Sequence, residues 1–418
     1  RFLPLIFNIS VIPFVYFLLK KLTDSEEIAL LALLIYVIIS PSYAWFIMGG
    51  GITRASGWLF AVIAINVYLD SISHFKKVNY ILLPILIALT FACHLEIGYF
   101  LVFTLLLFYL FFSKSFKGAF FISITGIISI ILLMPYWITV VRYHGISIFF
   151  NVFSASEFNI EYSILKFFFF NFTFERFMPI VAVISFLGFV FCLFSNKKYF
   201  SVWLLVILFL DPRSVDRSSS IVISALAAIG YFKIVFPGIQ KAIKTNPRIN
   251  SNKYEIFIHS VFYFFIIFGF LFSSFVTSSS DAAISEDHRD AMGKISHTIP
   301  NPSRFLVLSE IDDWGKDQVG EWFPALSERE SILTVQGTEW LGGGVFSNKV
   351  RNYNDLGDCI KRNATCFEEW FKDNKKDFDY VYFSKELINT QKIRVENILN
   401  SPTAIIDNED VLVYKVDH

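Results

Sequence analysis

A charged turn near the middle of the chain lies directly between two apolar runs. Residues 211–217 read Asp-Pro-Arg-Ser-Val-Asp-Arg, with four charged side chains in seven residues. As a helix, the 13 residues 199–211 would span only about 20 Å of a hydrocarbon layer about 30 Å thick. Charges at that depth cost about 2.5 to 3.5 kcal/mol each and usually face a water-filled or ligand-filled cavity. The turn is therefore expected to line a functional cavity below the membrane surface; a turn that only sets topology and thins the bilayer is the alternative.

A second short hairpin places His94 and Glu96 at a similar depth. They separate the apolar runs 80–93 and 97–112, which are about 21 and 24 Å long as helices. Both side chains are therefore expected in the outer leaflet, either in a ligand site or as a pair that hydrogen-bonds neighbouring helices.

A third hairpin, residues 49–54, reads Gly-Gly-Gly-Ile-Thr-Arg. Glycines let backbone amides approach a ligand closely, and the guanidinium group of Arg54 matches phosphate oxygens in a bidentate manner. The segment has neither the preceding strand nor the following Lys of a nucleotide-binding P-loop.

The elements that must position these groups are helices in a membrane. With 418 residues, 55% of them hydrophobic and 50 of them Phe, the chain is too apolar for one soluble domain. We predict a polytopic α-helical membrane protein with about ten transmembrane helices in residues 1–276. The predicted spans are 2–19, 28–47, 55–69, 80–93, 97–112, 118–141, 178–194, 199–210, 218–236 and 254–276.

Lysine-rich connections alternate with the charged hairpins along these spans, and the lysines define one side of the membrane. They are Lys20, Lys21, Lys76, Lys77, Lys114, Lys117, Lys197, Lys198, Lys241, Lys244 and Lys253, with Arg248. By the positive-inside rule that side is the cytoplasm. The three hairpins, the loop 142–177 and everything after residue 276 are then extracytoplasmic, in a multi-pass plasma-membrane protein.

The loop 142–177 mixes apolar clusters with charges, which predicts a helix in the plane of the interface. Arg142 and His144 begin it, and either snorkel to headgroups or contact a ligand.

Residues 277–418 are polar and mixed in composition, and predict one small extracytoplasmic α/β domain. Cys359 and Cys366 flank an expected turn at Asn363, so we predict that they are close enough to form a disulfide. The predicted strands are 304–311, 331–335, 378–383 and a terminal hairpin of 403–406 with 411–416; the predicted helices are 367–375 and 391–399.

Several short strings resemble the GT-C superfamily of membrane glycosyltransferases, in the branch of protein mannosyltransferase-like proteins that depend on lipid-phosphate-linked sugars. The strings are GGGITRASGWL at 49–59, HLE at 94–96, LDPRSVDR at 210–217, EWFPAL at 321–326 and QGTEW at 336–340. The resemblance covers most of the chain. It implies transfer of a sugar, with inversion, from a polyprenyl or dolichyl phosphate to an acceptor hydroxyl on the outer face of the membrane.

The family's main catalytic carboxylate lies in a first extracytoplasmic loop, and no matching acidic loop is present in this sequence. Since the first residue is Arg1 rather than Met, we expect the chain to be truncated at its N-terminus and this carboxylate to lie upstream. The resemblance leaves open whether a divalent metal ion takes part, and the sequence holds no complete ligand set.

Residue chemistry and the resemblance together give the expected roles. A lipid phosphate lies at headgroup depth and needs recessed arginines, and an acceptor hydroxyl needs a carboxylate or imidazole to take its proton. The expected phosphate ligands are Arg54, Arg213 and Arg217; the expected catalytic groups are His94, Glu96 and Asp216; and the expected supporting residues are Asp211, Arg142 and His144. Arg54, His94, Glu96, Arg213, Asp216 and Arg217 are expected to line one cavity, because a shared hydrated pocket costs less than separate burials of charge.

Two other classes of protein fit some of these features. A lipid or oligosaccharide transporter or flippase also buries charge in a membrane, although typically near its midplane and often with an internal repeat. A non-catalytic scaffold would use the C-terminal domain to bind a partner. The expected partners are a lipid-linked sugar donor, membrane lipids and an acceptor that the sequence does not identify; no nucleic-acid partner is expected.

Overall fold

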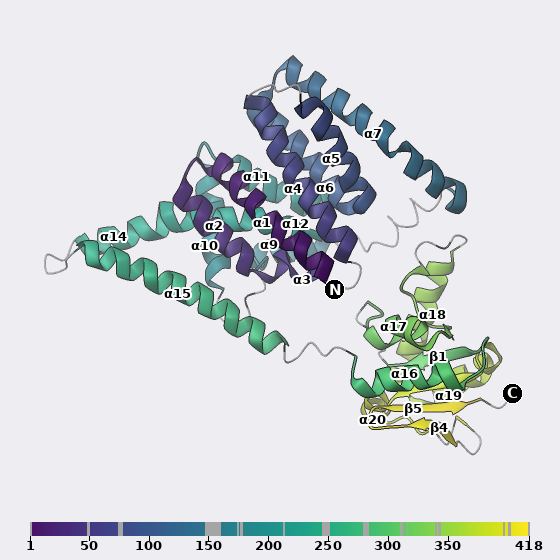
Figure 1. Ribbon diagram of the computed structural model, residues 1–418. Coiled ribbons are helices and arrows are strands. Elements are labelled where there is room, and N and C mark those ends of the chain that lie inside the picture. The colour runs from purple at the N-terminus through teal and green to yellow at the C-terminus, as the bar shows by residue number, and fades with distance from the viewer. Residues whose placement is uncertain are drawn as a thin grey trace. The chain divides into compact units, whose positions relative to one another are not determined.

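A computed structural model of the chain contains two compact units, each with its own hydrophobic core (Figure 1). Unit 1 comprises Arg1–Thr139 and Glu157–Ser278, and unit 2 comprises Val140–Ser156 and Ser279–His418. The structure describes residues 2–416 apart from 48–50, 74–77, 147–159, 174, 176–178, 212–213, 245–250, 279–283, 310–311, 316, 339–340, 342–343, 396–397 and 400–402.

All the described secondary structure of the membrane part is helical. In chain order it contains α1 (Phe2–Thr23), α2 (Glu26–Ile38), η1 (Ser40–Ser42), α3 (Ala44–Ile47), α4 (Gly51–Ser73), α5 (Asn79–Cys93), α6 (Leu95–Phe108), η2 (Tyr109–Ser113), α7 (Phe116–His144), α9 (Ile160–Phe169), α10 (Ile180–Leu193), α11 (Tyr199–Leu210), α12 (Val215–Ser218), α13 (Ser220–Gly230), η4 (Tyr231–Val235), α14 (Phe236–Lys244) and α15 (Ser251–Ser278).

The prediction of ten spans is wrong in number. Within the described residues, six helical stretches are long and apolar enough to cross a membrane, or seven if the bent pair α2 and η1–α3 counts as one span. Two of them join consecutive elements, α6 with η2 (Leu95–Ser113) and α13 with η4 and part of α14 (Ser220–Ile243), and the other four are Phe2–Thr23, Gly51–Ile72, Phe116–Tyr143 and Tyr254–Phe272. Each of the ten predicted segments is helical, but the pair α2 and η1–α3 is bent by 83° and three segments are too short. The short ones, α5, α10 and α11, have 15, 14 and 12 residues, and a helix needs about 20 residues to cross the hydrocarbon layer. The chain is thus a multi-pass membrane protein with several helices that do not reach across.

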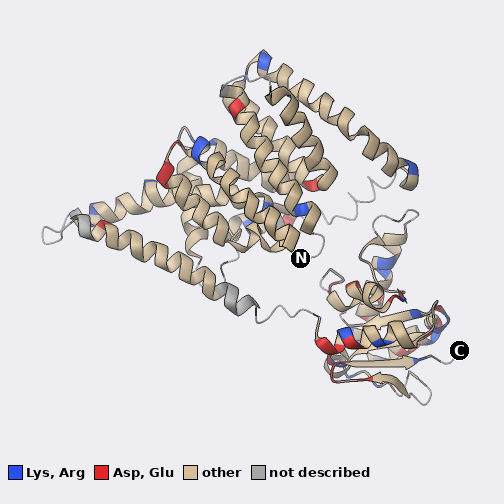
Figure 2. Cartoon of the chain, viewed as in Figure 1, with Lys and Arg blue, Asp and Glu red and all other residues tan. Residues whose placement is uncertain are grey.

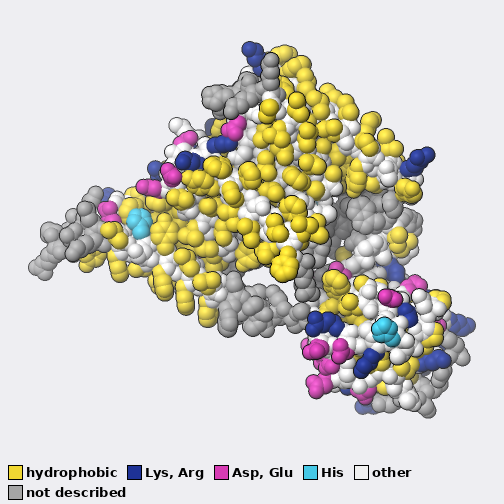
Figure 3. Space-filling view, viewed as in Figure 1, with side chains coloured by type: hydrophobic (Ala, Val, Ile, Leu, Met, Phe, Trp, Pro, Cys, Tyr) yellow, Lys and Arg dark blue, Asp and Glu magenta, His cyan; other side chains and the backbone are white. Residues whose placement is uncertain are grey.

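The surface of unit 1 fits a bilayer environment. The walls of its helices carry almost no charge in the view of Figure 2, where Lys, Arg, Asp and Glu gather near helix ends. Large apolar side chains cover the face seen in Figure 3. Helices α7 and α15 expose Ile130, Ile131, Phe264 and Phe268 among others. In lipid such side chains need no further protein cover.

A close helix crossing in unit 1 depends on two glycines. Helices α10 and α13 pack extensively against each other. A Cβ added to Gly188 would lie 1.9 Å from the carbonyl oxygen of Leu226, and one added to Gly230 would lie 2.2 Å from that of Ile184. Small residues at such crossings let backbones approach and maximise van der Waals contact, which drives helix association in lipid. This crossing holds α13 in place. Because α12 directly precedes α13, the crossing also helps to position the charged turn at 211–217.

Unit 2 contains the five-stranded sheet and the helices that cover it. The strand order is β2-β1-β3-β5-β4. Strand β1 pairs in parallel with β2 and β3, and β5 pairs antiparallel with β3 and β4. Its elements are α16 (Glu286–Thr298), β1 (Arg304–Leu308), α17 (Gln318–Ser327), β2 (Glu330–Ser331), α18 (Val345–Arg362), α19 (Ala364–Asn374), η6 (Lys375–Asp377), β3 (Tyr380–Ser384), α20 (Lys385–Gln391), β4 (Ala404–Asp407) and β5 (Val411–Lys415).

Alternation along β1 builds the core on both faces of the sheet. Phe305 and Val307 pack in a cluster with α16 and α17, whereas Leu306 and Leu308 pack in a cluster with α18 and α19. Successive strand residues point to opposite faces, so an apolar run of this kind is buried on both sides.

The α/β pattern predicted for this region is present, with two corrections. The predicted strand at 331–335 is only the two-residue β2, since the chain turns after Ser331. The predicted helix at 391–399 is wrong, because α20 ends at Gln391 and Lys392 adopts a left-handed conformation that terminates it. The predicted terminal hairpin is formed by β4 and β5.

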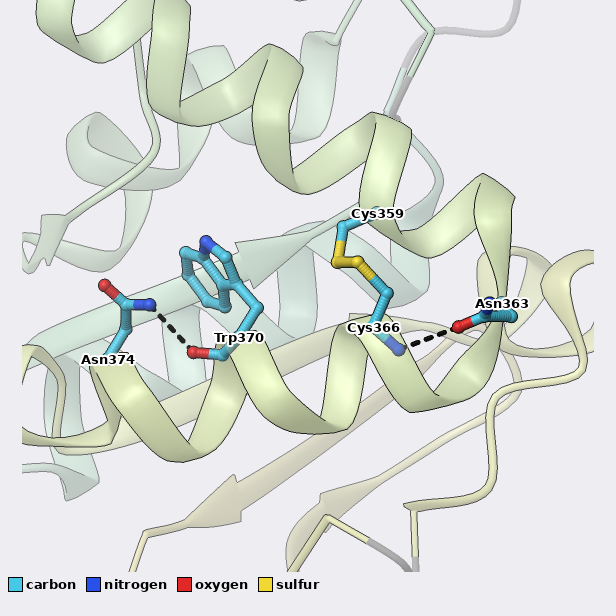
Figure 4. Close-up of a disulfide and its surroundings, with 5 residues drawn as sticks. All are labelled: Cys359, Asn363, Cys366, Trp370 and Asn374. Atoms are coloured by element: carbon cyan, nitrogen blue, oxygen red, sulfur yellow. Dashed lines mark hydrogen bonds between the residues drawn. A yellow bond between two sulfur atoms is a disulfide. The ribbon is translucent and has the colours of Figure 1, made fainter.

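The predicted disulfide is present (Figure 4). Cys359 near the end of α18 is bonded to Cys366 in the first turn of α19, with their α-carbons 5.4 Å apart. Asn363 caps α19 by accepting a hydrogen bond from the amide of Cys366 at 2.8 Å, which turns the chain between the two helices.

Candidate anion site in unit 1

Polar side chains from three parts of unit 1 converge on the indole ring of Trp45 in α3. The guanidinium carbon of Arg217 lies 3.6 Å from the ring centroid, and that of Arg54 lies 4.3 Å from it. The imidazole of His94 meets the same ring edge to face, with the centroids 5.2 Å apart and the planes at 85°. Cations are attracted to the electron-rich face of an indole, so the Trp45 ring stabilises both guanidinium groups. We call these four residues the Trp45 cluster.

The break after α2 places Trp45 in this position. Helix α2 ends at Ile39, which is extended, and Pro41 then starts the short helix η1. This produces the 83° bend and returns α3 against the start of α4. There, Nη1 of Arg54 donates to the carbonyl oxygen of Trp45 at 3.4 Å.

His94 occupies the sharp break between α5 and α6. Its backbone is extended, so it ends α5 and begins α6. This break brings Glu96, in the first turn of α6, to the charged turn after α11.

Glu96 is linked to Arg217 through Ser214. The Ser214 hydroxyl donates to Oε1 of Glu96, and Nη2 of Arg217 donates to Oγ of Ser214 at 2.6 Å. The same Nη2 lies 3.8 Å from Oε1 of Glu96. The side chains of Glu96 and Arg217 are both about three-quarters or more buried. Each charge therefore compensates the other inside the apolar unit.

The two aspartates of the turn have separate partners. Asp211 accepts a hydrogen bond from the hydroxyl of Ser218 at 2.6 Å, which closes the turn between α11 and α13. Asp216 pairs through Oδ2 with Nζ of Lys166 in α9, and its Oδ1 is buried and accepts no hydrogen bond from the described residues.

A small cleft opens beside these groups. Its apolar walls come from aromatic side chains and its polar end from the Glu96–Ser214–Arg217 chain. The lining residues are Trp45, Phe46, Trp58, Glu96, Ile97, Ser214, Arg217 and Ser218. An apolar slot with a charged end has the polarity expected around the anionic group of an amphiphile. Its free volume of about 10 Å³ is that of about one water molecule.

The structure brings together most of the residues singled out from sequence. Of the six expected to line one cavity, Glu96 and Arg217 line the cleft, whereas Arg54, His94 and Asp216 are not among its lining residues. Arg54, His94 and Arg217 meet on Trp45, and Glu96 joins them through Ser214. Asp211 and Asp216 flank them in the same turn. Arg213 lies outside the described residues.

Arg142 and His144 were expected in a loop, and this is wrong. Both belong to the last turn of α7, because the apolar helical pattern runs on to residue 144. Arg142 is exposed there, and the side chain of His144 lies outside the described part of the chain.

Three residues of the site were missed from sequence. Trp45 was placed in a continuous span, although the Ser-Pro-Ser at 40–42 signals a break just before it. Lys166 was counted among the charges of an interfacial helix, and α9 does occupy part of that loop. Ser214 has no distinguishing sequence signal.

The described residues do not fit a resident divalent metal. No group of three or more His, Cys, Asp or Glu side chains within them is arranged to hold an ion. Glu96, Asp211 and Asp216 have the separate partners given above. We therefore derive no step through a metal.

No protein-family model matches the chain, and no curated protein matches it. Among solved structures, the chain is similar to the archaeal oligosaccharyltransferase AglB from Archaeoglobus fulgidus, in complex with an inhibitory peptide and a dolichol-phosphate, with 12% identity and a TM-score of 0.49. The match covers 92% of this chain and 58% of that one, so the chain spans little more than half the length of that structure.

Proposed function

We propose that the chain is a membrane glycosyltransferase that moves a sugar from a polyprenyl- or dolichyl-phosphate-linked donor to an acceptor hydroxyl at the extracytoplasmic face. The observation that carries this proposal is that Arg54 and Arg217 both lie on the Trp45 ring, and that Trp45 and Arg217 line a small cleft with apolar walls. A guanidinium group matches a phosphate in charge and in the geometry of its donors.

In the proposed reaction the acceptor oxygen bonds to the anomeric carbon of the sugar as the bond from that carbon to the phosphate oxygen breaks. The electron pair of the broken bond stays on the polyprenyl phosphate, whose added negative charge Arg54 and Arg217 stabilise. Stabilising charge that develops on a leaving group is a large contribution to group-transfer catalysis.

The acceptor proton needs a base, and His94 and Glu96 are our candidates. His94 lies against the ring that holds both arginines, and Glu96 is one hydroxyl away from Arg217. Asp216, which sequence reasoning also placed in this role, is engaged with Lys166. The protein mannosyltransferase-like branch, the inverting stereochemistry and the roles of Arg213 and Asp211 belong to the same proposal.

The proposed orientation puts the Trp45 cluster and unit 2 outside the cytoplasm, with Lys76, Lys197 and Lys244 inside. Single-cysteine labelling of intact cells tests it. A membrane-impermeant probe should react at position 347 and not at position 197; the opposite pattern would remove a lipid-linked donor from reach of the site.

The central experiment measures binding of dolichyl phosphate and of undecaprenyl phosphate to the purified full chain in nanodiscs, against the uncharged polyprenols. The phosphates should bind more tightly than the alcohols. Arg217→Ala should abolish this preference, and Arg217→Lys should keep part of it through charge alone, since an ammonium group cannot form the bidentate pair.

A matched control is Arg289→Ala, which removes an exposed arginine of α16 in unit 2 and should leave binding unchanged. Equal binding of phosphates and alcohols by the parent chain would contradict the lipid-phosphate site. Phosphate binding accompanied by transport of the lipid across vesicles, without glycosyl transfer, would favour the flippase alternative. A chain that binds neither lipid would favour the scaffold alternative.

A further inference from the structure

Helix α9 directs its charged side chain inward and its apolar side chains outward, the reverse of an amphipathic helix on the surface of a soluble protein. Its lysine, Lys166, has a side chain only 5% exposed, whereas Leu165, Phe168 and Phe169 are exposed. On the inner side, Phe167 packs against Phe189 of α10 with ring centroids 5.5 Å apart. An apolar outer face and an inward charge are what a helix shows when lipid, not water, surrounds it.

The inward lysine meets the charged turn. Nζ of Lys166 pairs with Oδ2 of Asp216, whose side chain is 19% exposed. Burying two charges is costly, and the pairing offsets that cost only while both partners are present. The pair therefore fixes α9 to α12, the four-residue helix that also carries Arg217.

We propose that Lys166 is a positioning residue of the anion site: by neutralising Asp216, it keeps Arg217 directed at Trp45 and available to a lipid phosphate. This inference rests on the proposed function. The reasoning is electrostatic. Without Lys166, the negative charge of Asp216 would be buried without its cation, next to Arg217 in the same short helix. One of its oxygens, Oδ1, already accepts no hydrogen bond from the described residues. Such a carboxylate attracts the nearest guanidinium group, and a guanidinium drawn to Asp216 leaves the ring and the cleft.

A charge-cancelling double variant tests this role in the full chain in nanodiscs. The measured quantities are the Kd for dolichyl phosphate and the melting temperature. Lys166→Met should weaken binding about tenfold or more, because it leaves an uncompensated buried charge. Lys166→Met with Asp216→Asn should restore the Kd to within about threefold of the parent value, since the competing anion is then gone. Lys166→Arg, which keeps the positive charge, should stay within the same range.

Each other outcome overturns the inference. If Lys166→Met binds like the parent, Lys166 does not position the site. If the double variant regains its melting temperature but not its affinity, Lys166 contacts the phosphate itself and is not a positioning residue. Lys294→Met, at an exposed lysine of α16, is the matched control and should change neither quantity.

The same measurements separate this inference from the proposed function. Loss of binding in Arg217→Ala with full binding in Lys166→Met would leave the lipid-phosphate site standing and remove only the role of Lys166. A parent chain that binds dolichyl phosphate no better than dolichol would remove both.

Discussion

The guanidinium carbon of Arg217 lies 3.6 Å from the centre of the Trp45 ring, although the two residues belong to helices far apart in the sequence. The same ring holds Arg54 and His94. The electron-rich face of an aromatic ring attracts cations. Trp45 therefore gives both arginines a favourable partner inside an apolar unit, in addition to any carboxylate. Trp45 is thus the residue on which the proposed anion site depends most directly.

Replacing Trp45 by Ala should weaken dolichyl phosphate binding by about tenfold, because two cation–π contacts worth about 0.5–2 kcal/mol each are removed. Trp45→Phe should retain most of the affinity, since a smaller ring keeps a face for the cations. The measurement is the Kd in nanodiscs. Trp322→Ala, at an exposed tryptophan of unit 2, is the matched control. An unchanged Kd in Trp45→Ala would show that the ring does not organise the site.

The crossing of α10 and α13 should not tolerate a methyl group. Gly188→Ala and Gly230→Ala should each destabilise the chain by about 1–3 kcal/mol or prevent its folding, because the added Cβ meets a backbone carbonyl that cannot move aside. The melting temperature in detergent measures this. Gly126→Ala in α7 is the control, since a Cβ there meets no atom within 4 Å. Equal melting temperatures for all three variants would contradict the close crossing.

The bond between Cys359 and Cys366 should stabilise unit 2 by about 2 kcal/mol, through loss of freedom in the unfolded chain. The Cys359→Ser/Cys366→Ser variant should accordingly be cut by thermolysin at a lower urea concentration. Under denaturing conditions without reductant, alkylation and mass spectrometry should modify only the other two cysteines, Cys93 and Cys192. Modification of all four would mean that the bond does not form in cells.

The stability of unit 2 should fall as the pH drops below about 6.5. Burial lowers the pKa of His288 from its ordinary 6.5, against the opposing effect of Asp410, Asp287 and Glu386. Below pH 6.5 the unfolded chain therefore binds more protons than the folded one, and protonation favours unfolding. This stability is fully present above pH 6.5 and is lost as the pH falls toward the lower folded pKa.

Pulse proteolysis with thermolysin at pH 7.5 and 5.5 measures this dependence on the full chain. His288→Gln should flatten it, because Gln does not titrate and can still reach the hydroxyl of Tyr382, which lies 2.6 Å from Nδ1 of His288. His297→Gln, at the exposed end of the same helix, should leave it unchanged. A steeper dependence in His288→Gln would reverse the sign of the argument.

Local patterns in the sequence determined much of the architecture. All ten apolar segments are helical, because apolar composition and helix formation in lipid depend on the segment alone. The terminal hairpin and the disulfide likewise followed from residues close together in the chain. The recessed depth expected of Glu96 and Arg217 rests on how many residues precede each turn, and it stays a prediction.

Only the tertiary structure decided which helices are long enough to cross a membrane and which side chains contact one another. The bend before Trp45 converts part of a predicted span into the wall of a site, and no local pattern says where that wall will lie. The partner of Asp216 could not be read either, because Lys166 reaches it from a helix 50 residues away. Long-range pairing of buried charges is set by how whole helices pack, and that packing depends on contacts such as Gly188 with Gly230, which follow from the shape of the complete unit.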